Sequence, residues 1–369
     1  MDFSFNARIE HAYTLPSALY TDPACLALER ERVFHRTWQL VGRTEQVARI
    51  GDYFTVDVAG EPVVVARGAD DQVRAFYNVC RHRAGPVALE QGNRQTFVCY
   101  YHGWTYNLDG SLRHAPEFEE VQDVDRRAMA LRPVRVESWG PLLFVNLDPD
   151  APSLTEFLGD IPQRTAGHRI GEMRWALRKD YEIACNWKVY VDNYLEGYHI
   201  PVVHPGLYRE IDYDAYRVET FRYSSLQHSP IRGAESRGYG GERRYQPGPD
   251  DPPDAQYYWV FPNLMLNIYL GQMSTNLVVP LSHDRTLTIF EWYFLDADVP
   301  ETRQKIDQVV KFGDEIQDED IFICEHVQRG LNSRSYDRGR YSVKRENGVY
   351  HFHALVHEFL CSHVHTLER

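Results

Sequence analysis

The chain has 369 residues, 43% of them hydrophobic and 25% charged, which is enough for a sizeable core in two domains or one large one. Its formal charge of −13 argues against a nucleic-acid partner, because binding to phosphate backbones needs clustered lysine and arginine. No apolar run approaches the roughly 18 residues of a membrane helix, and the polar N-terminus is unlike a secretory signal, so we expect a soluble, cytoplasmic protein with no membrane partner.

The first part of the chain changes from a helical to a β-rich pattern. Residues 22–38 have the charged, periodic composition of a helix that Asp22 caps and Pro23 begins. From about residue 41 to residue 148, short β-rich runs alternate with turns that contain glycine and aspartate; the clearest runs are 53–58, 63–66, 73–79, 96–101 and 142–145. This pattern predicts a small antiparallel β domain of roughly a hundred residues.

The second half begins after Pro-Asp-Ala-Pro at residues 149–152, a composition typical of a junction. Residues 184–199 have a helical pattern, and a long helix is expected from about residue 300 to residue 330. Three strand-like runs lie between them, at 257–270, 275–280 and 286–295, after a polar, Gly/Pro-rich segment at 233–253 that is expected to be a surface loop. The half is therefore predicted to be an antiparallel sheet with helices, which makes the whole chain α+β.

The strongest functional signal is a pair of Cys/His motifs, Cys-Arg-His at 80–82 and Cys-Tyr-Tyr-His at 99–102. A Rieske-type [2Fe–2S] cluster is held by two cysteines on one iron and two histidines on the other, and this predicts four cluster ligands: Cys80, His82, Cys99 and His102. Gly103 would allow a close backbone approach and Trp104 would add an apolar shield. The alternative is a structural Cys2His2 zinc site, although zinc fingers usually pair Cys with Cys and His with His.

A second metal site is predicted from histidines in the second half. Within the helical pattern of residues 186–199, Glu196 and His199 share one face, and Pro201 is expected to end the helix just past His199. His204 then follows on an irregular segment, and a turn of chain between the two histidines would aim both imidazoles at one point.

The expected third ligand is a carboxylate, because non-haem Fe(II) oxygenases bind iron with two histidines and one carboxylate on one face. Asp320 interrupts the apolar stripe of the C-terminal helix, where a carboxylate is costly unless it is paired or bound to metal. The stripe consists of Val309, Phe312, Ile316, Ile323 and Val327. The acids outside it are expected to form a solvated helix face: Asp314, Glu315, Asp318 and Glu325.

Together these motifs resemble the catalytic α subunits of Rieske non-haem iron oxygenases, the ring-hydroxylating and N-demethylating family, over nearly the whole chain from about Trp38 to His353. The matching segments are 80–83, 99–104, 186–188, 196–199 with His204, and 319–320. The family's cluster ligands match Cys80, His82, Cys99 and His102, and its iron ligands match His199, His204 and Asp320. The resemblance implies a helix-grip type of catalytic domain at 149–369, to which a helical segment at 1–37 also belongs, and a Rieske domain at 38–148.

Members of this family place a carboxylate three residues before the first iron-binding histidine, where it bridges the cluster of one subunit to the iron of its neighbour. Here the position is Glu196, where ring-hydroxylating dioxygenases commonly carry Asp. With Trp-Gly-Pro at 139–141 and the segment 192–196, this looks more like the choline, carnitine and glycine-betaine monooxygenases. The resemblance implies a homotrimer, or a multiple of three, and a separate NAD(P)H-dependent flavin or iron–sulfur reductase, since the chain has no dinucleotide-binding Gly-rich motif.

The leading hypothesis is a terminal oxygenase that uses O2 and reductase electrons to hydroxylate or N-demethylate a small quaternary ammonium compound. Such a cation is held by aromatic faces, each worth about 0.5–2 kcal/mol, and the candidates in the second half are Tyr208, Tyr213, Tyr216, Tyr223, Tyr257, Tyr258, Trp259 and Trp292. The alternative substrate is an aromatic or heteroaromatic acid. A different class of function is an electron-transfer protein in which only the Rieske domain works.

Overall fold

The computed structural model describes residues 3–123, 125–228, 255–269, 271–297 and 299–361. The chain forms two compact units, one made of residues 34–156 and one made of residues 1–33 together with 157–369. The limits expected from the sequence, after residues 37 and 148, stay a prediction for the domain boundaries. No helix in the described ranges is both long and apolar enough to cross a membrane.

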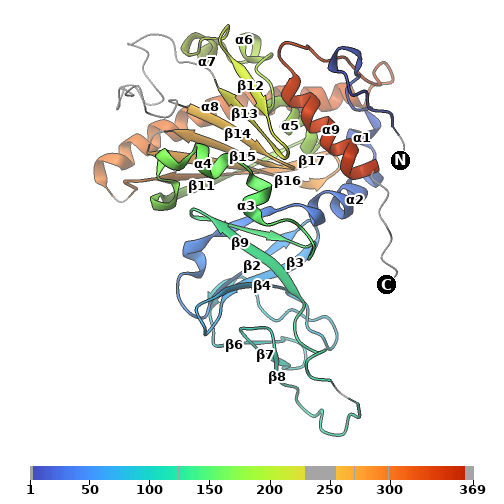
Figure 1. Ribbon diagram of the computed structural model, residues 1–369, viewed down its shortest axis with the longest axis vertical. Helices are drawn as coiled ribbons and strands as arrows, with labels where there is room; N and C mark the ends of the chain where they lie inside the picture. Colours follow the sequence, from blue (N-terminus) through green and yellow to red (C-terminus); the bar gives the residue numbers. More distant parts are fainter. Residues whose placement is uncertain (1–2, 124, 229–254, 270, 298, 362–369) are drawn as a thin grey trace. The chain divides into compact units, whose positions relative to one another are not determined.

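The unit of residues 34–156 is built from antiparallel strands (Figure 1). Its larger sheet has seven strands in the order β1-β10-β9-β4-β3-β2-β5, with bounds β1 Gln39–Arg43, β2 Asp52–Val58, β3 Glu61–Arg67, β4 Val73–Tyr77, β5 Gln91–Asn93, β9 Pro133–Trp139 and β10 Leu142–Asn146. A three-stranded sheet contains β6 Thr96–Val98, β7 Thr105–Asn107 and β8 Leu112–His114. Short 3-10 helices cover Phe34–Arg36 and Thr44–Val47.

Strand β3 explains why this unit has two cores. Its run Val63-Val64-Val65-Ala66 is fully buried, because successive side chains of a strand point to opposite faces and both faces are covered. Val63 and Val65 pack in one core, while Val64 and Ala66 pack in the other. The second core also contains Cys80, Cys99, Trp104 and Tyr106. The expected cluster loops therefore stand on a rigid, apolar base.

The other unit has a seven-stranded antiparallel sheet in the order β11-β17-β16-β15-β14-β13-β12. The strands are β11 Arg174–Ile183, β12 Arg217–Thr220, β13 Ser224–His228, β14 Ala255–Val260, β15 Leu264–Tyr269, β16 Gln272–Ser282 and β17 Arg285–Phe294. Its helices are α1 Ala18–Thr21, α2 Pro23–Arg32, α4 Ile161–Arg164, α5 Trp187–Tyr194, α6 Ile200–Val203, α7 Pro205–Glu210, α8 Pro300–Leu331 and α9 Asn347–Cys361; α3 is Leu154–Leu158. Short 3-10 helices cover Ile9–His11, Ala166–His168 and Ile170–Glu172.

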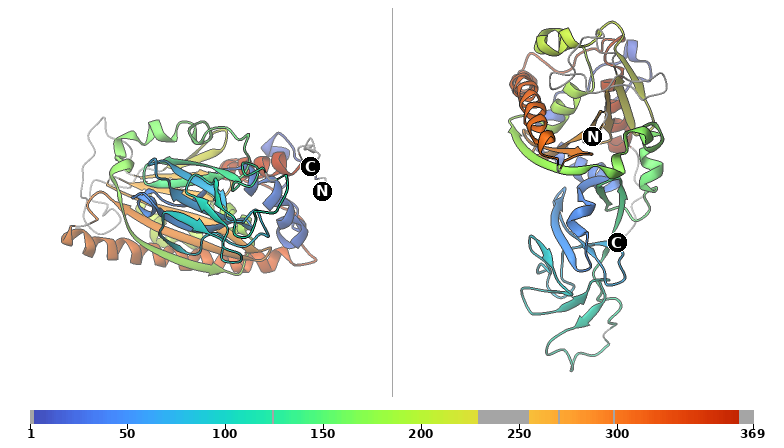
Figure 2. Two further views of the ribbon diagram at one scale, coloured as in Figure 1. Left: turned by 90° about the horizontal axis from the view of Figure 1, so that it is seen from below. Right: turned by 90° about the vertical axis from the view of Figure 1, so that its left-hand side faces the viewer.

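Helices α5 and α8 cover one face of this sheet, and α8 runs along it (Figures 1 and 2). On that face the Gln317 amide of α8 donates to the Thr288 hydroxyl of β17 at 3.3 Å. The opposite face carries Gln256 of β14, whose amide lies 3.1 Å from His168. The α+β architecture expected from the sequence is confirmed, and the helix expected over 300–330 is α8.

Several expected boundaries are wrong. Asp22 caps α2, accepting from the Ala24 amide as predicted, but α2 ends at Arg32 and not near residue 38. The helix expected over 184–199 ends at Tyr194, and Pro201 lies in the first turn of α6 instead of ending a helix. The run 257–270 is two strands, β14 and β15, because the backbone turns at residues 261–263. The whole of the loop expected at 233–253 lies outside the described residues.

Candidate metal centres

The two cluster loops have the same backbone hydrogen bonds. The amide of Cys80 donates to the carbonyl of Gly85, and the amide of Cys99 donates to the carbonyl of Trp104, five residues on in each case. Each cysteine carbonyl also accepts from the amide four residues later, from Ala84 at 3.0 Å and from Gly103 at 3.0 Å. Ala84 and Gly103 both have a positive φ, of 58° and 72°, so each loop turns back at the equivalent residue. The two loops are therefore matched holders for one thiol and one imidazole each.

The thiols and imidazoles of these loops lie in different surroundings. Cys80 and Cys99 are buried, whereas His82 and His102 are exposed within the chain, with their ring centroids 4.6 Å apart. The indole of Trp104 stacks on His82 at 5.0 Å with an angle of 5° between the rings, which is the apolar shield expected from the sequence. A cluster bound here would have its cysteine side in the core and its histidine side at the surface of the unit.

The loop geometry favours a two-iron cluster over the zinc alternative. Four ligands of one tetrahedral zinc ion, with bonds of about 2.0–2.3 Å, would all lie within one small shell. In the part of the chain that the structure describes, only His199, His204 and Asp320 form a group of three or more His, Cys, Asp or Glu donor atoms within 4.8 Å of one another. The Cys/His donors of the two loops do not converge on one point, as a single zinc would require, and suit a cluster with two metal atoms.

The pKa of His82 fits the same ligand set. Desolvation first, and then the nearby His102 and Arg83, lower the pKa of His82, which favours the neutral imidazole that binds metal. Burial raises the pKa of the Cys80 thiol, against which the hydrogen bond from Tyr106 acts. The Tyr106 hydroxyl lies 3.2 Å from Cys80 Sγ, a contact that the sequence motifs did not indicate.

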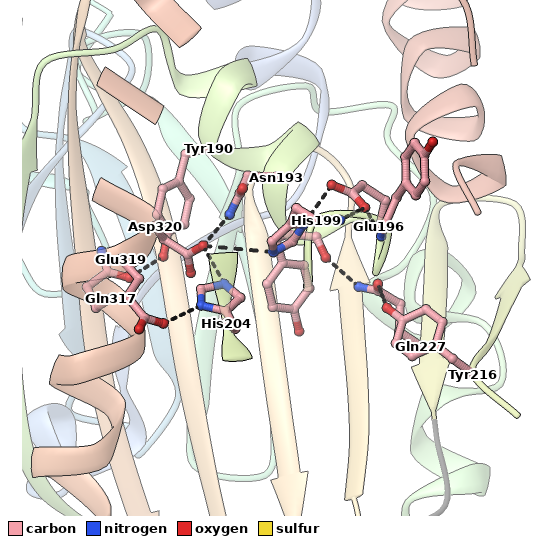
Figure 3. Close-up of polar contacts among 12 residues, drawn as sticks. Tyr190, Asn193, Glu196, His199, His204, Tyr216, Gln227, Gln317, Glu319 and Asp320 are labelled. Carbon is pink, nitrogen blue, oxygen red and sulfur yellow. Dashed lines mark hydrogen bonds and ion pairs between the residues drawn. The ribbon is translucent and has the colours of Figure 1, made fainter. Parts of the chain in front are cut away.

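The second site is formed where α8 passes the segment between α5 and α7 (Figure 3). His204 Nε2 lies 3.0 Å from Asp320 Oδ1, and His199 Nε2 lies 4.0 Å from the same oxygen. His204 is 2% exposed, and the other two side chains are about one-sixth exposed (17% and 15%). Two imidazoles and one carboxylate that converge from one side match the two-His-one-carboxylate set of non-haem iron oxygenases.

Each of the three donors has an outer partner. Glu196 Oε1 lies 2.6 Å from His199 Nδ1, and Glu319 Oε2 lies 2.6 Å from His204 Nδ1. The Asn193 amide donates to Asp320 Oδ1 at 2.6 Å. Such carboxylate–histidine pairs fix the imidazole tautomer so that Nε2 faces the metal. Of these partners, Glu319 lies in a segment matched by resemblance, but its contact with His204 could not be deduced from spacing.

Two carboxylates, those of Asp320 and Glu319, lie beside the buried imidazole of His204. Burial alone would lower the pKa of His204, but the hydrogen bonds and charges of Asp320 and Glu319 outweigh it and raise that pKa. Protons therefore compete with a metal ion for this imidazole more strongly than for an ordinary histidine.

The structure corrects the reasoning that led to Asp320. Val327, a member of the expected apolar stripe, is 43% exposed, and the buried positions on this part of α8 are Gln317, Cys324 and Gln328. Asp320 does face inward, but among polar neighbours. The acids expected to be solvated are also not uniform. Asp314 pairs with Lys179 and Tyr181, and Glu325 accepts from the Ala184 amide.

Glu196 and His199 are brought together by a turn and not by a helix face. Helix α5 ends at Tyr194, and the Glu196 carboxylate accepts from the backbone amides of Tyr198 and His199. These bonds close a compact turn in which His199 lies between Glu196 and Asp320 (Figure 3).

Comparison with known proteins gives the class. Residues 37–125 match the Rieske [2Fe-2S] domain, and residues 170–362 match the catalytic domain of the ring hydroxylating alpha subunit. The protein is thus an oxidoreductase of the iron-dependent oxygenase class, with a [2Fe–2S] cluster and a mononuclear iron as cofactors. This excludes a protein that serves only for electron transfer.

The chain belongs to the Rieske oxygenases, as an α subunit of the choline and carnitine monooxygenase branch. It is 36% identical to the chloroplastic choline monooxygenase of Arabidopsis thaliana, over 97% of this chain and 86% of that protein. It is 31% identical to the oxygenase subunit of carnitine monooxygenase from Escherichia coli K12, over 96% and 95%. A solved quaternary ammonium Rieske monooxygenase, described in relation to carnitine oxidation and inter-subunit electron transfer, has a TM-score of 0.84 at 30% identity, covering 96% of this chain and 97% of that one.

Proposed function

We propose that this chain is the terminal oxygenase of a multicomponent system that hydroxylates or N-demethylates a small quaternary ammonium compound. The similarity, at 31–36% identity over at least 95% of the chain, to proteins named choline or carnitine monooxygenases carries this proposal. In the net reaction a C–H bond becomes C–OH, one oxygen atom of O2 becomes water, and NAD(P)H supplies two electrons. A hydroxylated N-methyl group then leaves as formaldehyde.

The geometry of the two sites supports the proposed ligands. The [2Fe–2S] cluster would be held by Cys80, His82, Cys99 and His102, and the mononuclear iron by His199, His204 and Asp320. The bound iron supplies the open positions at which O2 is activated. Glu196 holds the Nδ1 proton of His199 and would conduct electrons from the cluster of a neighbouring subunit.

The proposed substrate surface is a row of residues that crosses the sheet. Gln227, Tyr257, Asn267, Ser274 and Trp292 lie opposite one another on β13, β14, β15, β16 and β17. Residues directly opposite in antiparallel strands point to the same face. Here that face is covered by α5 and α8, from which Asn193 and Asp320 also come.

This row has the chemistry that a quaternary ammonium group needs. The indole of Trp292 and the phenol of Tyr257 are separated by the neutral Asn267 and Ser274, and a cation held over an aromatic face gains about 0.5–2 kcal/mol. Two other candidates lie elsewhere. Tyr258 points to the opposite face of the sheet, and Tyr223 stacks on Phe157.

The proposed partners are a flavin or iron–sulfur reductase that passes electrons from NAD(P)H and two further copies of this chain. The similar Escherichia coli protein is an oxygenase subunit, and the similar solved structure is described in terms of inter-subunit electron transfer. We propose a cytoplasmic location for this protein; the similar plant proteins are chloroplastic.

The test is turnover with a surrogate reductase. Choline, carnitine, glycine betaine and a set of aromatic acids are each supplied with NADH and O2, and formaldehyde, hydroxylated products and O2 uptake are measured. We expect product from at least one ammonium compound. Product from aromatic acids alone would refute the proposal in favour of the alternative substrate class.

Metal analysis tests the ligand assignment separately. Two cluster irons and one further iron per chain are expected. Asp320→Ala should lose only the further iron and keep the visible spectrum of the cluster, whereas Asp318→Ala, two residues away on an exposed part of α8, should keep all three. Full iron retention by Asp320→Ala would contradict the assignment.

A further inference from the structure

We propose that Gln227 and Tyr216 are positioning residues. They fix the position of the turn that contains Glu196 and His199 relative to the row of sheet residues that forms the proposed substrate surface. The inference rests on the proposed function for the roles of Glu196 and of the row. What is new is a physical link between Glu196 and the row, made of hydrogen bonds that join β13 and β15 to the end of α5.

The first contact is at the end of α5. A helix leaves its last carbonyl groups without partners inside the helix, and they must be satisfied from elsewhere. The carbonyl of Tyr194, the last residue of α5, accepts from Gln227 Nε2 at 2.7 Å. Gln227 is 3% exposed, so water does not replace this bond when it is lost. The amide of one strand residue thus fixes where the helix stops, two residues before Glu196.

The second contact holds Gln227 itself. Its Oε1 accepts from the Tyr216 hydroxyl, so both ends of the amide are used and its orientation is set (Figure 3). Burial, and then the charge of Glu196, raise the pKa of Tyr216 well above its usual range. The phenol therefore keeps its proton and remains a donor.

The third contact is between a ring and a glycine. A Cβ atom placed on Gly197 would lie 2.7 Å from Cζ and 2.8 Å from Cε1 of Tyr216, which is closer than real carbon atoms approach. Only glycine fits, and the ring of Tyr216 lies directly against the backbone that follows Glu196. The ring of Tyr216 therefore restricts the position of the backbone at Gly197. Its hydroxyl holds Gln227, which in turn holds the carbonyl at the end of α5.

The fourth contact joins the turn to the row. The Tyr194 hydroxyl donates to Asn267 Oδ1 at 2.9 Å, and Asn267 Nδ2 donates to Ser274 Oγ at 3.1 Å. Tyr194 is thus tied to the row at two points, by its carbonyl at Gln227 and by its hydroxyl at Asn267. A ligand that displaces this row moves the end of α5 through a continuous set of hydrogen bonds.

The consequence concerns electron transfer. Glu196 holds His199 at 2.6 Å, so an electron path through this contact lengthens when the turn moves. Loss of the Gln227 or Tyr216 contact should therefore slow passage of electrons to the iron site without removing a metal ligand.

The test uses the full-length, cluster- and iron-loaded protein and the variants Tyr216→Phe and Gln227→Met. The matched controls are Tyr258→Phe and Gln256→Met, because both residues are buried on the neighbouring strand β14 but point to the other face of the sheet. Iron and sulfide content, the cluster potential and the rate at which O2 reoxidises the pre-reduced cluster are measured, with and without bound substrate. We expect severalfold slower reoxidation in the two variants, unchanged potential and iron content, and wild-type behaviour in both controls.

A second set of variants guards against simple misfolding. Gly197→Ala should slow reoxidation because its methyl group meets the Tyr216 ring, and this penalty should vanish in the Tyr216→Ala background. Wild-type rates in Tyr216→Phe and Gln227→Met, iron loss that accounts for the whole decrease, or additive effects of Gly197→Ala and Tyr216→Ala would each overturn the inference. Failure of the proposed substrate class is seen separately, in the turnover screen, because reoxidation is compared between variants whatever the substrate proves to be.

Discussion

The phenol of Tyr106 should set part of the reduction potential of the cluster. Tyr106 is fully buried, its oxygen accepts from the Arg81 amide at 3.0 Å, and its hydroxyl lies 3.2 Å from Cys80 Sγ. When Cys80 binds iron as a thiolate it has no proton to give, so the phenol must be the donor in this contact. Hydrogen bonds to the sulfur ligands are one of the determinants of iron–sulfur potentials.

The size of the effect follows from the charge on the sulfur. A hydrogen bond to a charged group contributes about 1.5–3 kcal/mol, and the bond is stronger when the cluster carries the additional electron. A difference of about 1–2 kcal/mol between the two redox states corresponds to about 40–90 mV for a one-electron couple, at 59 mV per tenfold change in the equilibrium constant. Tyr106→Phe removes only the hydroxyl, so the potential should fall by that amount.

The assay is a redox titration followed by the visible absorption or the EPR signal of the reduced cluster. Tyr53→Phe is the matched control, because Tyr53 belongs to the same core but donates to the Leu89 carbonyl at 3.2 Å and not to a cluster ligand. An unchanged potential in Tyr106→Phe, or an equal decrease in Tyr53→Phe, would show that the phenol does not tune the cluster.

Three further predictions concern the other unit. Glu319→Ala should weaken iron binding about 10–100-fold, measured by chelator competition, because it removes the carboxylate that orients His204. Lys188→Met should lower the free energy of unfolding by about 3–5 kcal/mol in urea titrations, because it leaves the fully buried Glu29 without its ion-pair partner. Burial, and then neighbouring acids, raise the pKa of Glu346 in the folded protein. The protein therefore loses stability as the pH rises from the pKa of this group in the unfolded chain to its pKa in the folded protein. The melting temperature of Glu346→Gln, minus that of the wild type, should therefore increase from acidic to neutral pH.

Each of these three predictions has its own control. Glu315→Ala lies on an exposed part of α8 and should leave iron affinity unchanged. The double variant Lys188→Met with Glu29→Leu should recover most of the lost stability, since no buried charge remains unpaired. For Glu346, a melting-temperature difference that stays constant with pH would show that the carboxyl group does not titrate within the transition range.

The two cluster loops could be recognised in the sequence because their determinants are local. Ligands come from two short segments, and the equivalent turns at Ala84 and Gly103 depend on neighbouring backbone atoms. The second site is different, since Asp320 lies more than a hundred residues from His204 and must be found by periodicity. That periodicity selected the carboxylate that lies beside His199 and His204. The stripe itself was incorrectly described, because Val327 is exposed and the buried Gln317 and Gln328 lie outside it.

The end of α5 could not be predicted from its own residues. The helical pattern continues to His199, and the only local sign of a break is Gly197. That glycine is required by the ring of Tyr216, and the helix end by the amide of Gln227, both of which approach only in the folded chain. Strand β11 was missed for a related reason. It lies at the edge of the sheet, its charged residues include three in a row at 178–180, and only Ile183 is fully buried, so it has no apolar face that a sequence pattern would show.

The way the chain is divided between its two units has a consequence for biosynthesis. Residues 34–156 form an insertion whose first and last strands, β1 and β10, are adjacent and antiparallel, so this unit has all its strands as soon as residue 146 has been made. Residues 1–33 can take their final positions only when the C-terminal part of the chain has been made. The Tyr20 hydroxyl contacts His353 at 3.1 Å, and the Tyr350 hydroxyl donates to the Asn6 carbonyl. On the ribosome, the iron–sulfur unit should therefore fold first, and the catalytic unit should close only after the last helix has left the exit tunnel.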